Sequence, residues 1–223
     1  MDSGSRPGRR PGSGGAEVIR RAGEHGLLVE TGALDVSHRL DAALRADRPQ
    51  GVVEVVPGPE TVLVVAPGAD QGRLLPRLAE LLASCAEGGE PAAPGEPQDV
   101  VTIPVVYDGE DLQAVARMAG ISTEEVIARH TGRELVVGWL GFAPGFAYLI
   151  GLDPVLHAPR LETPRTSVPA GSVAVAGPYS AVYPTASPGG WRLLGRTGLK
   201  VWDVAAEPPT TFRPGTRVRF EAA

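Results

Sequence analysis

Three glycine- and proline-rich segments in the second half of this 223-residue chain contain the residue types best suited to bind a small polar molecule. They span residues 141–149, 163–173 and 182–191, and a Gly-Arg-Thr triplet follows at 195–197. Glycine lets backbone N–H groups approach a ligand closely, and arginine offers a planar donor fork to a carboxylate or phosphate. Rigid loops that carry such groups on a β scaffold are typical of ligand sites, although tight turns of a barrel have a similar composition.

Polar and aromatic side chains in these segments are the first candidates for ligand contact. Arg165 could hold an anion or could form a surface ion pair. Tyr148, Tyr183 and Trp191 could line a flat pocket for a small ring. Aromatic residues make up only 5% of the chain, so these three could equally be the large anchors of the core. The other candidates are Thr166, Ser172, Ser187 and Arg196.

Common motifs for phosphate binding, serine hydrolysis and metal binding are missing from the sequence. It has no GxxxxGK[ST] loop, no GxSxG turn and no HExxH pair, its four histidines are scattered, and Cys85 is its only cysteine. No base lies at a recognisable spacing from Ser172 or Ser187, so neither is predicted to be a nucleophile. The catalytic residues are therefore unassigned, and no metal is expected.

Charge and hydropathy restrict the class of partner and the location. The formal net charge of −5 argues against non-specific nucleic-acid binding, which needs a basic surface. No apolar run reaches the roughly 18 residues that a membrane span needs. The first 15 residues lack the hydrophobic stretch of a secretory signal, and a single cysteine fits a reducing compartment. We expect a cytoplasmic protein that binds neither membrane nor nucleic acid.

Hydrophobic periodicity predicts a small α+β domain over residues 16–86. A strand at 26–30 precedes a helix at 35–45, and two valine-rich strands at 51–57 and 61–67 form a hairpin. A leucine stripe between Leu74 and Leu82 marks a second helix. The order β-α-β-β-α indicates one sheet with both helices on the same face, completed by a strand near 16–19 or after the linker. Residues 1–15 are expected to be a disordered tail.

A linker at residues 87–99, rich in proline, glycine and acidic residues, separates this domain from a mainly-β domain at 100–223. The second domain begins with a strand at 100–107, in which Pro104 marks an edge or bulge. Two short helices follow, the first capped by Asp108 and the second opened by a capping box at 122–125. Short strands at 135–140, 172–176, 199–204 and 216–221, separated by Gly/Pro turns, predict a barrel or sandwich.

The three segments resemble the motifs of the KipI/PxpB family, also called allophanate hydrolase subunit 1 or carboxyltransferase subdomain C. The family pattern GF-x-PGF-x-YL is present at 141–149, PR-x-x-x-PAGSV at 164–173, and YP-x-x-SPGGW followed by GRT at 183–197. The resemblance covers most of residues 100–220 and implies a cyclophilin-like β-barrel there. One departure lies at 177–181, where Gly-Pro-Tyr-Ser-Ala replaces a GGQTG-like turn and lacks its glutamine-type donor.

The resemblance also implies a function. It points to the B subunit of an ATP-dependent 5-oxoprolinase, which opens the lactam of 5-oxoproline to glutamate. The implied partners are a homologous C subunit (KipA/PxpC-like) and an A subunit (LamB/YcsF-like), with ATP used by the complex and no cofactor bound to this chain alone. Two alternatives remain, namely a KipI-like inhibitor of a histidine kinase and the carboxyltransferase half of a urea carboxylase/allophanate system.

Matching this chain to the family motifs yields a set of substrate-binding residues. Arg165 would clamp the carboxylate of 5-oxoproline or a similar acid. His130 ends a predicted helix, where its cation would suit the helix dipole, and the resemblance makes it a possible site residue. The predicted set is Phe142, Pro144, Gly145, Tyr148, Arg165, Thr166, Gly171, Ser172, Tyr183, Ser187, Gly189, Gly190, Trp191 and Arg196, with His130 as a possible addition.

Overall fold

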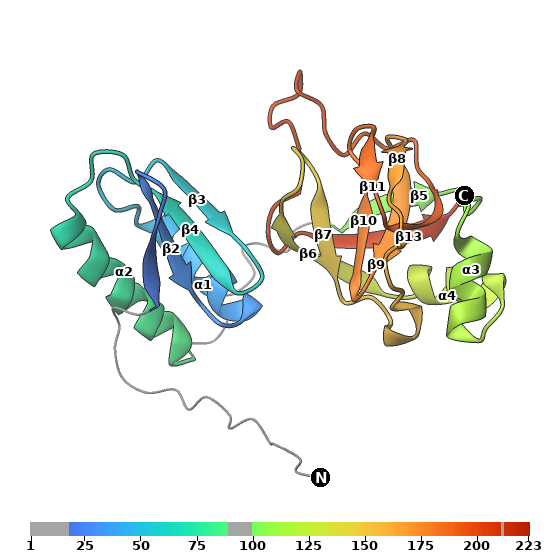
Figure 1. Ribbon diagram of the computed structural model, residues 1–223, viewed down its shortest axis with the longest axis horizontal. Helices are drawn as coiled ribbons and strands as arrows, with labels where there is room; N and C mark the ends of the chain where they lie inside the picture. The colour runs from blue at the N-terminus through green and yellow to red at the C-terminus, as the bar shows by residue number, and fades with distance from the viewer. Residues whose placement is uncertain (1–17, 89–99, 211) are drawn as a thin grey trace, which may run out of the picture. The chain divides into compact units, whose positions relative to one another are not determined.

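The computed structural model describes residues 18–88, 100–210 and 212–223. These residues form two compact units, one around residues 18–88 and the other around residues 100–223 (Figure 1). The predicted tail at 1–15 and most of the predicted linker at 87–99 lie outside the described residues. The domain boundaries proposed from the sequence therefore stay predictions.

The first unit contains a four-stranded sheet with the order β1-β2-β4-β3. Its strands are β1 (Ile19–Ala22), β2 (Gly26–Glu30), β3 (Glu54–Pro57) and β4 (Thr61–Val65). Alternate residues of β2 and β4 are buried, because successive side chains of a strand point to opposite faces. The predicted hairpin is present, and β1 supplies the extra strand expected near residues 16–19.

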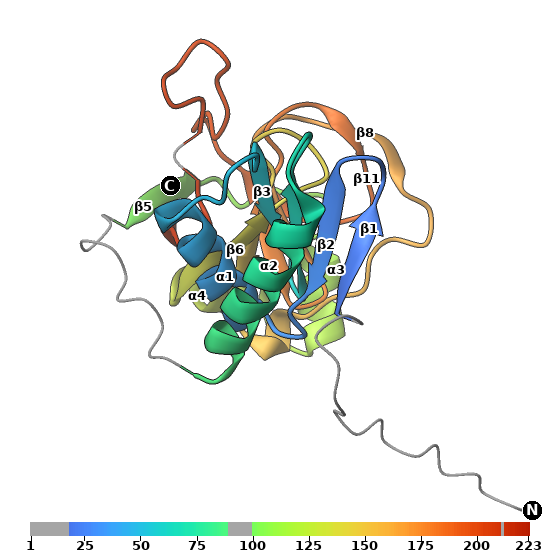
Figure 2. The same ribbon diagram turned by 90° about the vertical axis from the view of Figure 1, so that its left-hand side faces the viewer.

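Two helices cover the buried face of this sheet. They are α1 (Leu34–Ala46) and α2 (Gln71–Ala86), and they pack side by side (Figure 2). Leu40 and Leu44 of α1 and Leu74 and Leu78 of α2 join the same core as the buried strand residues. The Asp70 carboxylate accepts a hydrogen bond from the Gly72 N–H at 2.9 Å and so caps α2.

The second unit is built on a seven-stranded mixed sheet with the order β12-β9-β10-β7-β6-β13-β5. The strands are β5 (Val101–Val105), β6 (Glu134–Leu140), β7 (Ala147–Ile150), β9 (Ser172–Ala176), β10 (Tyr179–Val182), β12 (Arg192–Arg196) and β13 (Arg217–Ala222). Strands β13 and β5 pair in parallel. Val106 and Arg196 exchange two backbone hydrogen bonds of 2.9 Å, which link β5 to β12. The sheet is therefore a nearly closed barrel, and Pro104 lies on its edge strand as predicted.

A smaller sheet and three helical segments complete this unit. Strands β8 (Arg165–Val168) and β11 (Ser187–Gly189) pair with each other, within segments that the sequence suggests are loops. The helices are α3 (Leu112–Ala119), α4 (Thr123–Thr131) and the short η1 (Pro154–Leu156). The predicted capping box opens α4, because the Ser122 hydroxyl accepts from the Glu125 N–H at 3.2 Å.

Two local predictions are wrong. Asp108 does not cap α3, which begins at Leu112; its carboxylate instead accepts a hydrogen bond from Arg196 at 2.8 Å. Residues 199–204 form no strand. Val201 is buried, but Leu199 and Val204 are exposed, and the Asp203 N–H donates to the Pro209 carbonyl within its own loop at 2.8 Å. The alternating apolar residues form a loop here because no neighbouring strand among the described residues pairs with them.

Candidate functional site

Phe146 is the centre of an aromatic cluster that joins the first and third predicted segments. Its ring makes edge-to-face contacts with Phe142, Tyr148, Tyr183 and Trp191, at centroid distances of 5.2, 5.2, 5.3 and 5.5 Å. Such pairs stabilise by about 0.5–1.5 kcal/mol each beyond the area that they bury. Phe146, Tyr183 and Trp191 are buried, whereas Tyr148 is half-buried and Phe142 is exposed.

The outer part of the cluster is formed by three half-buried rings. Tyr148 stacks on Trp139 of β6 at 4.6 Å, and Tyr179 of β10 meets both rings edge-on at 5.1 and 5.9 Å. Tyr179 belongs to residues 177–181, where the chain departs from the family pattern. In place of a glutamine-type donor, this turn therefore provides a tyrosine ring that contacts Trp139 and Tyr148. The inner rings thus act as core anchors, while the outer rings could contact a ligand.

Glycines allow the third segment to pack against Tyr183. A Cβ at Gly189 would lie 2.2 Å from the Tyr183 hydroxyl oxygen, so only glycine fits there without a shift. Burial raises the pKa of Tyr183, and this effect is opposed by a hydrogen bond from the Trp191 N–H and by the charges of Arg160 and Arg165. Gly190 is tied to the neighbouring loop, because its carbonyl accepts from the Leu161 N–H at 2.7 Å.

In the first segment, Gly145 has φ +77° and lies against Trp202. A Cβ at this position would be 2.6 Å from the Trp202 Cβ. Pro144 beside it is exposed, and Phe142 has a positive φ of 71°, which is rare for a bulky residue. The turn therefore holds an exposed aromatic side chain in a strained conformation.

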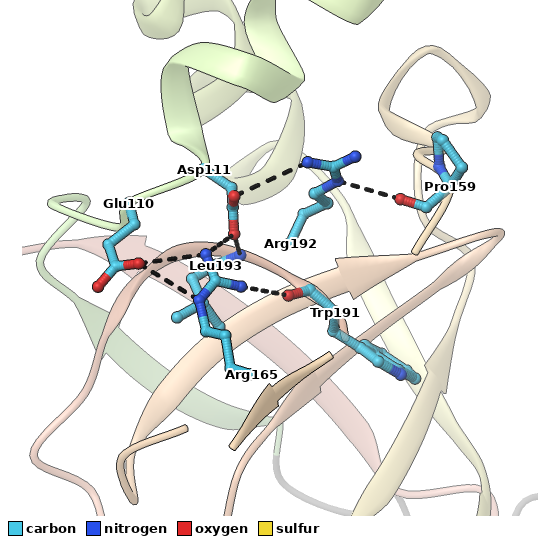
Figure 3. A network of polar contacts seen from close by, with 7 residues as sticks. All are labelled: Glu110, Asp111, Pro159, Arg165, Trp191, Arg192 and Leu193. Carbon is cyan, nitrogen blue, oxygen red and sulfur yellow. Dashed lines mark hydrogen bonds and ion pairs between the residues drawn. The ribbon is translucent and has the colours of Figure 1, made fainter. Parts of the chain in front are cut away.

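Arg165 is engaged by protein acceptors through each of its nitrogens (Figure 3). Its Nε and Nη2 donate to Glu110 Oε2 at 3.3 and 3.2 Å, Nη2 also donates to Asp111 Oδ2 at 2.9 Å, and Nη1 donates to the Trp191 carbonyl at 3.4 Å. A ligand carboxylate would have to compete with two protein carboxylates. The ion pair considered as the alternative is present, and the clamp role of Arg165 stays a prediction.

Asp111 connects α3 to β12 in the same network. Its buried carboxylate accepts from the Leu193 N–H at 2.8 Å, and the Asp111 N–H donates back to the Leu193 carbonyl at 3.0 Å. Arg192 forms an ion pair with its other oxygen at 3.9 Å. Figure 3 shows Asp111 between the two arginines.

His130 lies in the interior, in a hydrogen-bonded chain of buried and half-buried groups. The Ser180 hydroxyl donates to the Ala174 carbonyl at 3.2 Å, so it accepts from His130 Nε2–H at 2.9 Å, and the Tyr107 hydroxyl donates to His130 Nδ1 at 2.7 Å. The imidazole also stacks on Phe220 at 4.4 Å. Burial lowers the pKa of His130 to about 3, so the ring is neutral. The predicted cation at a helix end is therefore replaced by a neutral core residue.

The remaining predicted residues are spread over the second unit. Thr166 is exposed on β8 and Ser187 is half-buried on β11. Ser172 is buried at the start of β9, and Gly171 before it donates its N–H to the Tyr183 carbonyl at 2.8 Å. Arg196 is exposed at the end of β12 in its ion pair with Asp108. The ion pair directs the Arg196 guanidinium to Asp108 rather than to a ligand at the aromatic cluster.

Sequence reasoning missed several residues that the fold brings to the aromatic cluster or to the ion pairs of Arg165. Arg160 is the most notable, since its guanidinium carbon lies 5.9 Å from the centroid of the Trp191 ring. Glu110, Asp111 and Arg192 were missed because they lie outside the three segments. Phe146 could have been found, because it is the second phenylalanine of the GF-x-PGF motif.

The described residues lack two further kinds of feature. No group of three or more His, Cys, Asp or Glu side chains among them is arranged to hold a metal ion. None of their helices is both long and apolar enough to cross a membrane.

Comparisons with known proteins agree on one family. The family model described as "Carboxyltransferase domain, subdomain C and D" matches residues 17–212. The B subunit of 5-oxoprolinase from Escherichia coli O157:H7 is 41% identical over 173 residues, which are 76% of this chain and 77% of that protein. The protein of the same name from Bacillus subtilis (strain 168) is 49% identical over 124 residues, 54% of this chain and 52% of the relative.

Solved structures share the fold over most of the chain. The crystal structure of TTHA0988 is 38% identical with a TM-score of 0.76, and the match covers 92% of this chain and 40% of that one. The K. lactis urea amidolyase is 22% identical with a TM-score of 0.69, over 92% of this chain and 15% of that one, and shows the fold alone. The chain therefore belongs to the carboxyltransferase domain family, subdomain C and D, and its similarity to the B subunits of 5-oxoprolinase confirms the resemblance to the KipI/PxpB family.

Proposed function

We propose that this chain is the B subunit of an ATP-dependent 5-oxoprolinase complex that opens 5-oxoproline to glutamate. The observation that carries the proposal is the 41% identity to a 5-oxoprolinase B subunit across three quarters of the chain. The cluster around Phe146 supports it, because the first and third family motifs meet there. The cyclophilin-like classification of the barrel is part of the same proposal.

The role of the cluster in this proposal is to bind substrate. The half-buried rings of Trp139, Tyr148 and Tyr179 offer flat apolar surface to a small lactam ring. Backbone N–H groups of the glycine-rich segments would orient its polar atoms. Of the predicted binding residues, the exposed Phe142 and the half-buried Tyr148 remain the proposed side-chain contacts. Arg165 acts through its ion pairs, and Arg196 is paired with Asp108.

Catalysis and ATP binding are assigned to the other members of the complex. His130 is neutral and buried, so it has no access to a substrate proton. The arginines Arg165 and Arg192 are paired with carboxylates, and the sequence has no phosphate-binding loop, so these residues do not fit a triphosphate. We expect ATP to bind the homologous KipA/PxpC-like partner or the LamB/YcsF-like partner, and the complex to be cytoplasmic.

Exposed apolar residues near the cluster support assembly with the KipA/PxpC-like partner. Phe142 is 64% exposed, and the loop that packs Trp202 against Gly145 carries Leu199 and Val204, which are 38% and 83% exposed. Exposed aromatic and aliphatic side chains gathered on neighbouring loops are typical of protein interfaces.

Reconstitution tests this proposal directly. The chain is mixed with both partner proteins, ATP and 5-oxoproline, and glutamate is measured over time. We expect ATP-dependent glutamate formation that stops when this chain is omitted. Glutamate production at the same rate without the chain, or none from a verified complex, would refute the proposal.

A carboxyltransferase role is the second candidate, favoured by the family model and by the fold shared with urea amidolyase. This reaction needs a biotin carrier from another chain. Transfer of labelled carboxyl from carboxybiotin to urea by the complex, without glutamate formation from 5-oxoproline, would favour this candidate.

A further inference from the structure

We propose that Arg160 binds the carboxylate of a small cyclic acid that lies against the aromatic cluster, a role that the family motifs assign to Arg165. The inference rests on the proposed function for the identity of the acid. Three observations support the inference, namely the position of Arg160, the net charge around Trp191 and the N–H groups of the Arg160 guanidinium that are unpaired within the described residues.

The backbone on both sides of Arg160 is fixed by hydrogen bonds to three residues that are distant in the sequence. The Gly177 N–H donates to the Ala158 carbonyl at 2.8 Å, and Arg192 Nε donates to the Pro159 carbonyl at 3.1 Å. After Arg160, the Leu161 N–H donates to the Gly190 carbonyl at 2.7 Å. Arg160 is thus an exposed side chain on a segment whose backbone is held in place, and its guanidinium is positioned by the Trp191 ring.

The charged side chains around Trp191 carry a net positive charge. Three arginines lie near the ring or its backbone, but Arg165 and Arg192 share the carboxylates of Glu110 and Asp111. Within the described part of the chain, no carboxylate lies at ion-pair distance from Arg160, including that of Glu162 two residues later. Three positive charges therefore face two negative ones, and the surplus charge belongs to Arg160.

Arg160 has no hydrogen-bond acceptor for its guanidinium among the residues that the structure describes. The guanidinium meets the Trp191 ring at 5.9 Å, and such a cation–π contact uses no N–H donor. It can therefore offer a bidentate pair of N–H groups to a carboxylate. Its charge also acts at the Tyr183 hydroxyl, since Arg160 is one of the groups that oppose the raised pKa of Tyr183. A ligand carboxylate at Arg160 would lie beside Trp191, which is the last residue of the YP-x-x-SPGGW motif.

Two probes that differ by one carboxylate test the inference. L-5-oxoproline and 2-pyrrolidinone have the same lactam ring, and only the first has a carboxylate. We would measure glutamate formation from 5-oxoproline by the full complex, and inhibition by 2-pyrrolidinone, for wild type, Arg160→Gln and Arg160→Lys. Arg117→Gln is the matched control, because Arg117 is an exposed arginine on α3 with no ion-pair partner among the described residues.

We expect Arg160→Gln to raise KM for 5-oxoproline about tenfold to a hundredfold with a smaller change in kcat, as for loss of a charge-assisted hydrogen bond. Arg160→Lys should be intermediate, because it keeps the charge without the fork. The inhibition constant of 2-pyrrolidinone should not change, and Arg117→Gln should behave as wild type. An unchanged KM in Arg160→Gln would overturn the inference.

A direct binding measurement separates this inference from the proposed function. Calorimetric titration of the complex with 5-oxoproline needs no turnover, so it remains informative if no glutamate forms. Binding that is lost in Arg160→Gln but kept in Arg117→Gln supports the inference even then. No binding to wild type, equal binding to Arg160→Gln, or equally tight binding of inorganic phosphate at the same site would overturn it.

Discussion

Removing the Asp111 carboxylate should destabilise the barrel unit, because three groups depend on this one buried side chain. In Asp111→Ala, the buried Leu193 N–H loses its acceptor, Arg165 keeps only Glu110 and the Trp191 carbonyl, and Arg192 loses its ion pair. An unsatisfied buried N–H costs about 1–3 kcal/mol, and a hydrogen bond to a charged group contributes about 1.5–3 kcal/mol. Arg165 is partly solvated and retains Glu110, which reduces the second contribution.

We therefore expect Asp111→Ala to lower the free energy of unfolding by about 3 kcal/mol. For a protein of this size, this corresponds to a fall in Tm of roughly 6–12 °C. Asp111→Asn should lose about half as much, because its amide oxygen can still accept from the Leu193 N–H. Urea denaturation followed by tryptophan fluorescence reports on the correct unit, since all three tryptophans lie after residue 100.

A double-mutant cycle with Arg165→Gln isolates the ion pair from the other losses. Arg165 and Asp111 are in direct contact at 2.9 Å, so their effects should be non-additive by about 1 kcal/mol or more. A loss below about 1 kcal/mol in Asp111→Ala would show that Asp111 does not hold α3 to β12 in the network of Figure 3. Full additivity in the cycle would show that the ion pair between Asp111 and Arg165 contributes nothing to stability.

Three further predictions concern the core, the third segment and the exposed loop. Burial lowers the pKa of His130 to about 3, so below about pH 6.5 the unfolded chain takes up a proton that the folded chain does not. The free energy of unfolding should therefore fall by about 1.4 kcal/mol for each pH unit between about pH 6.5 and pH 3. Urea midpoints measured over this range should fall less steeply in His130→Gln than in wild type. Gly189→Ala should destabilise by about 1–3 kcal/mol, with partial rescue by Tyr183→Phe, because the new Cβ would lie 2.2 Å from the Tyr183 hydroxyl; equal loss in both backgrounds would contradict the clash. Phe142→Ala should weaken binding of the KipA/PxpC-like partner by about 1–3 kcal/mol while leaving urea stability nearly unchanged, and unaltered affinity in calorimetry would remove Phe142 from the interface.

Helices and strands with a strong local pattern could be predicted from the sequence. The leucine spacing that defines α1 and α2 depends on residues three or four positions apart, and the capping box at Ser122 is contained in four residues. Residues 199–204 show the limit of this approach. Their apolar residues resemble a strand, but a strand needs a hydrogen-bonding neighbour, which only the tertiary fold can supply.

The part of the candidate site that could be predicted is the part formed by the three glycine- and proline-rich segments. The sequence left open whether Tyr148, Tyr183 and Trp191 line a pocket or anchor the core. In the structure Tyr148 contacts Trp191, and Phe146 joins both rings to Tyr183; their role in binding stays a prediction. The state of each arginine could not be predicted, because Arg165 is paired by carboxylates more than fifty positions earlier. The same limit applies to His130, whose partner Ser180 comes from a distant strand.

The most direct test of this account is the glutamate assay with Tyr148→Ala in the reconstituted complex. The substitution removes a proposed contact surface for the lactam ring. Because the Tyr148 ring also contacts four other aromatic rings, a urea denaturation curve must show that the variant is folded at the assay temperature. We predict ATP-dependent glutamate formation by wild type and a reduced kcat/KM for the variant, with intact complex in both. Wild-type kcat/KM in Tyr148→Ala would contradict the assignment of the aromatic cluster as the substrate site, and a wild-type complex that forms no glutamate would contradict the 5-oxoprolinase assignment itself.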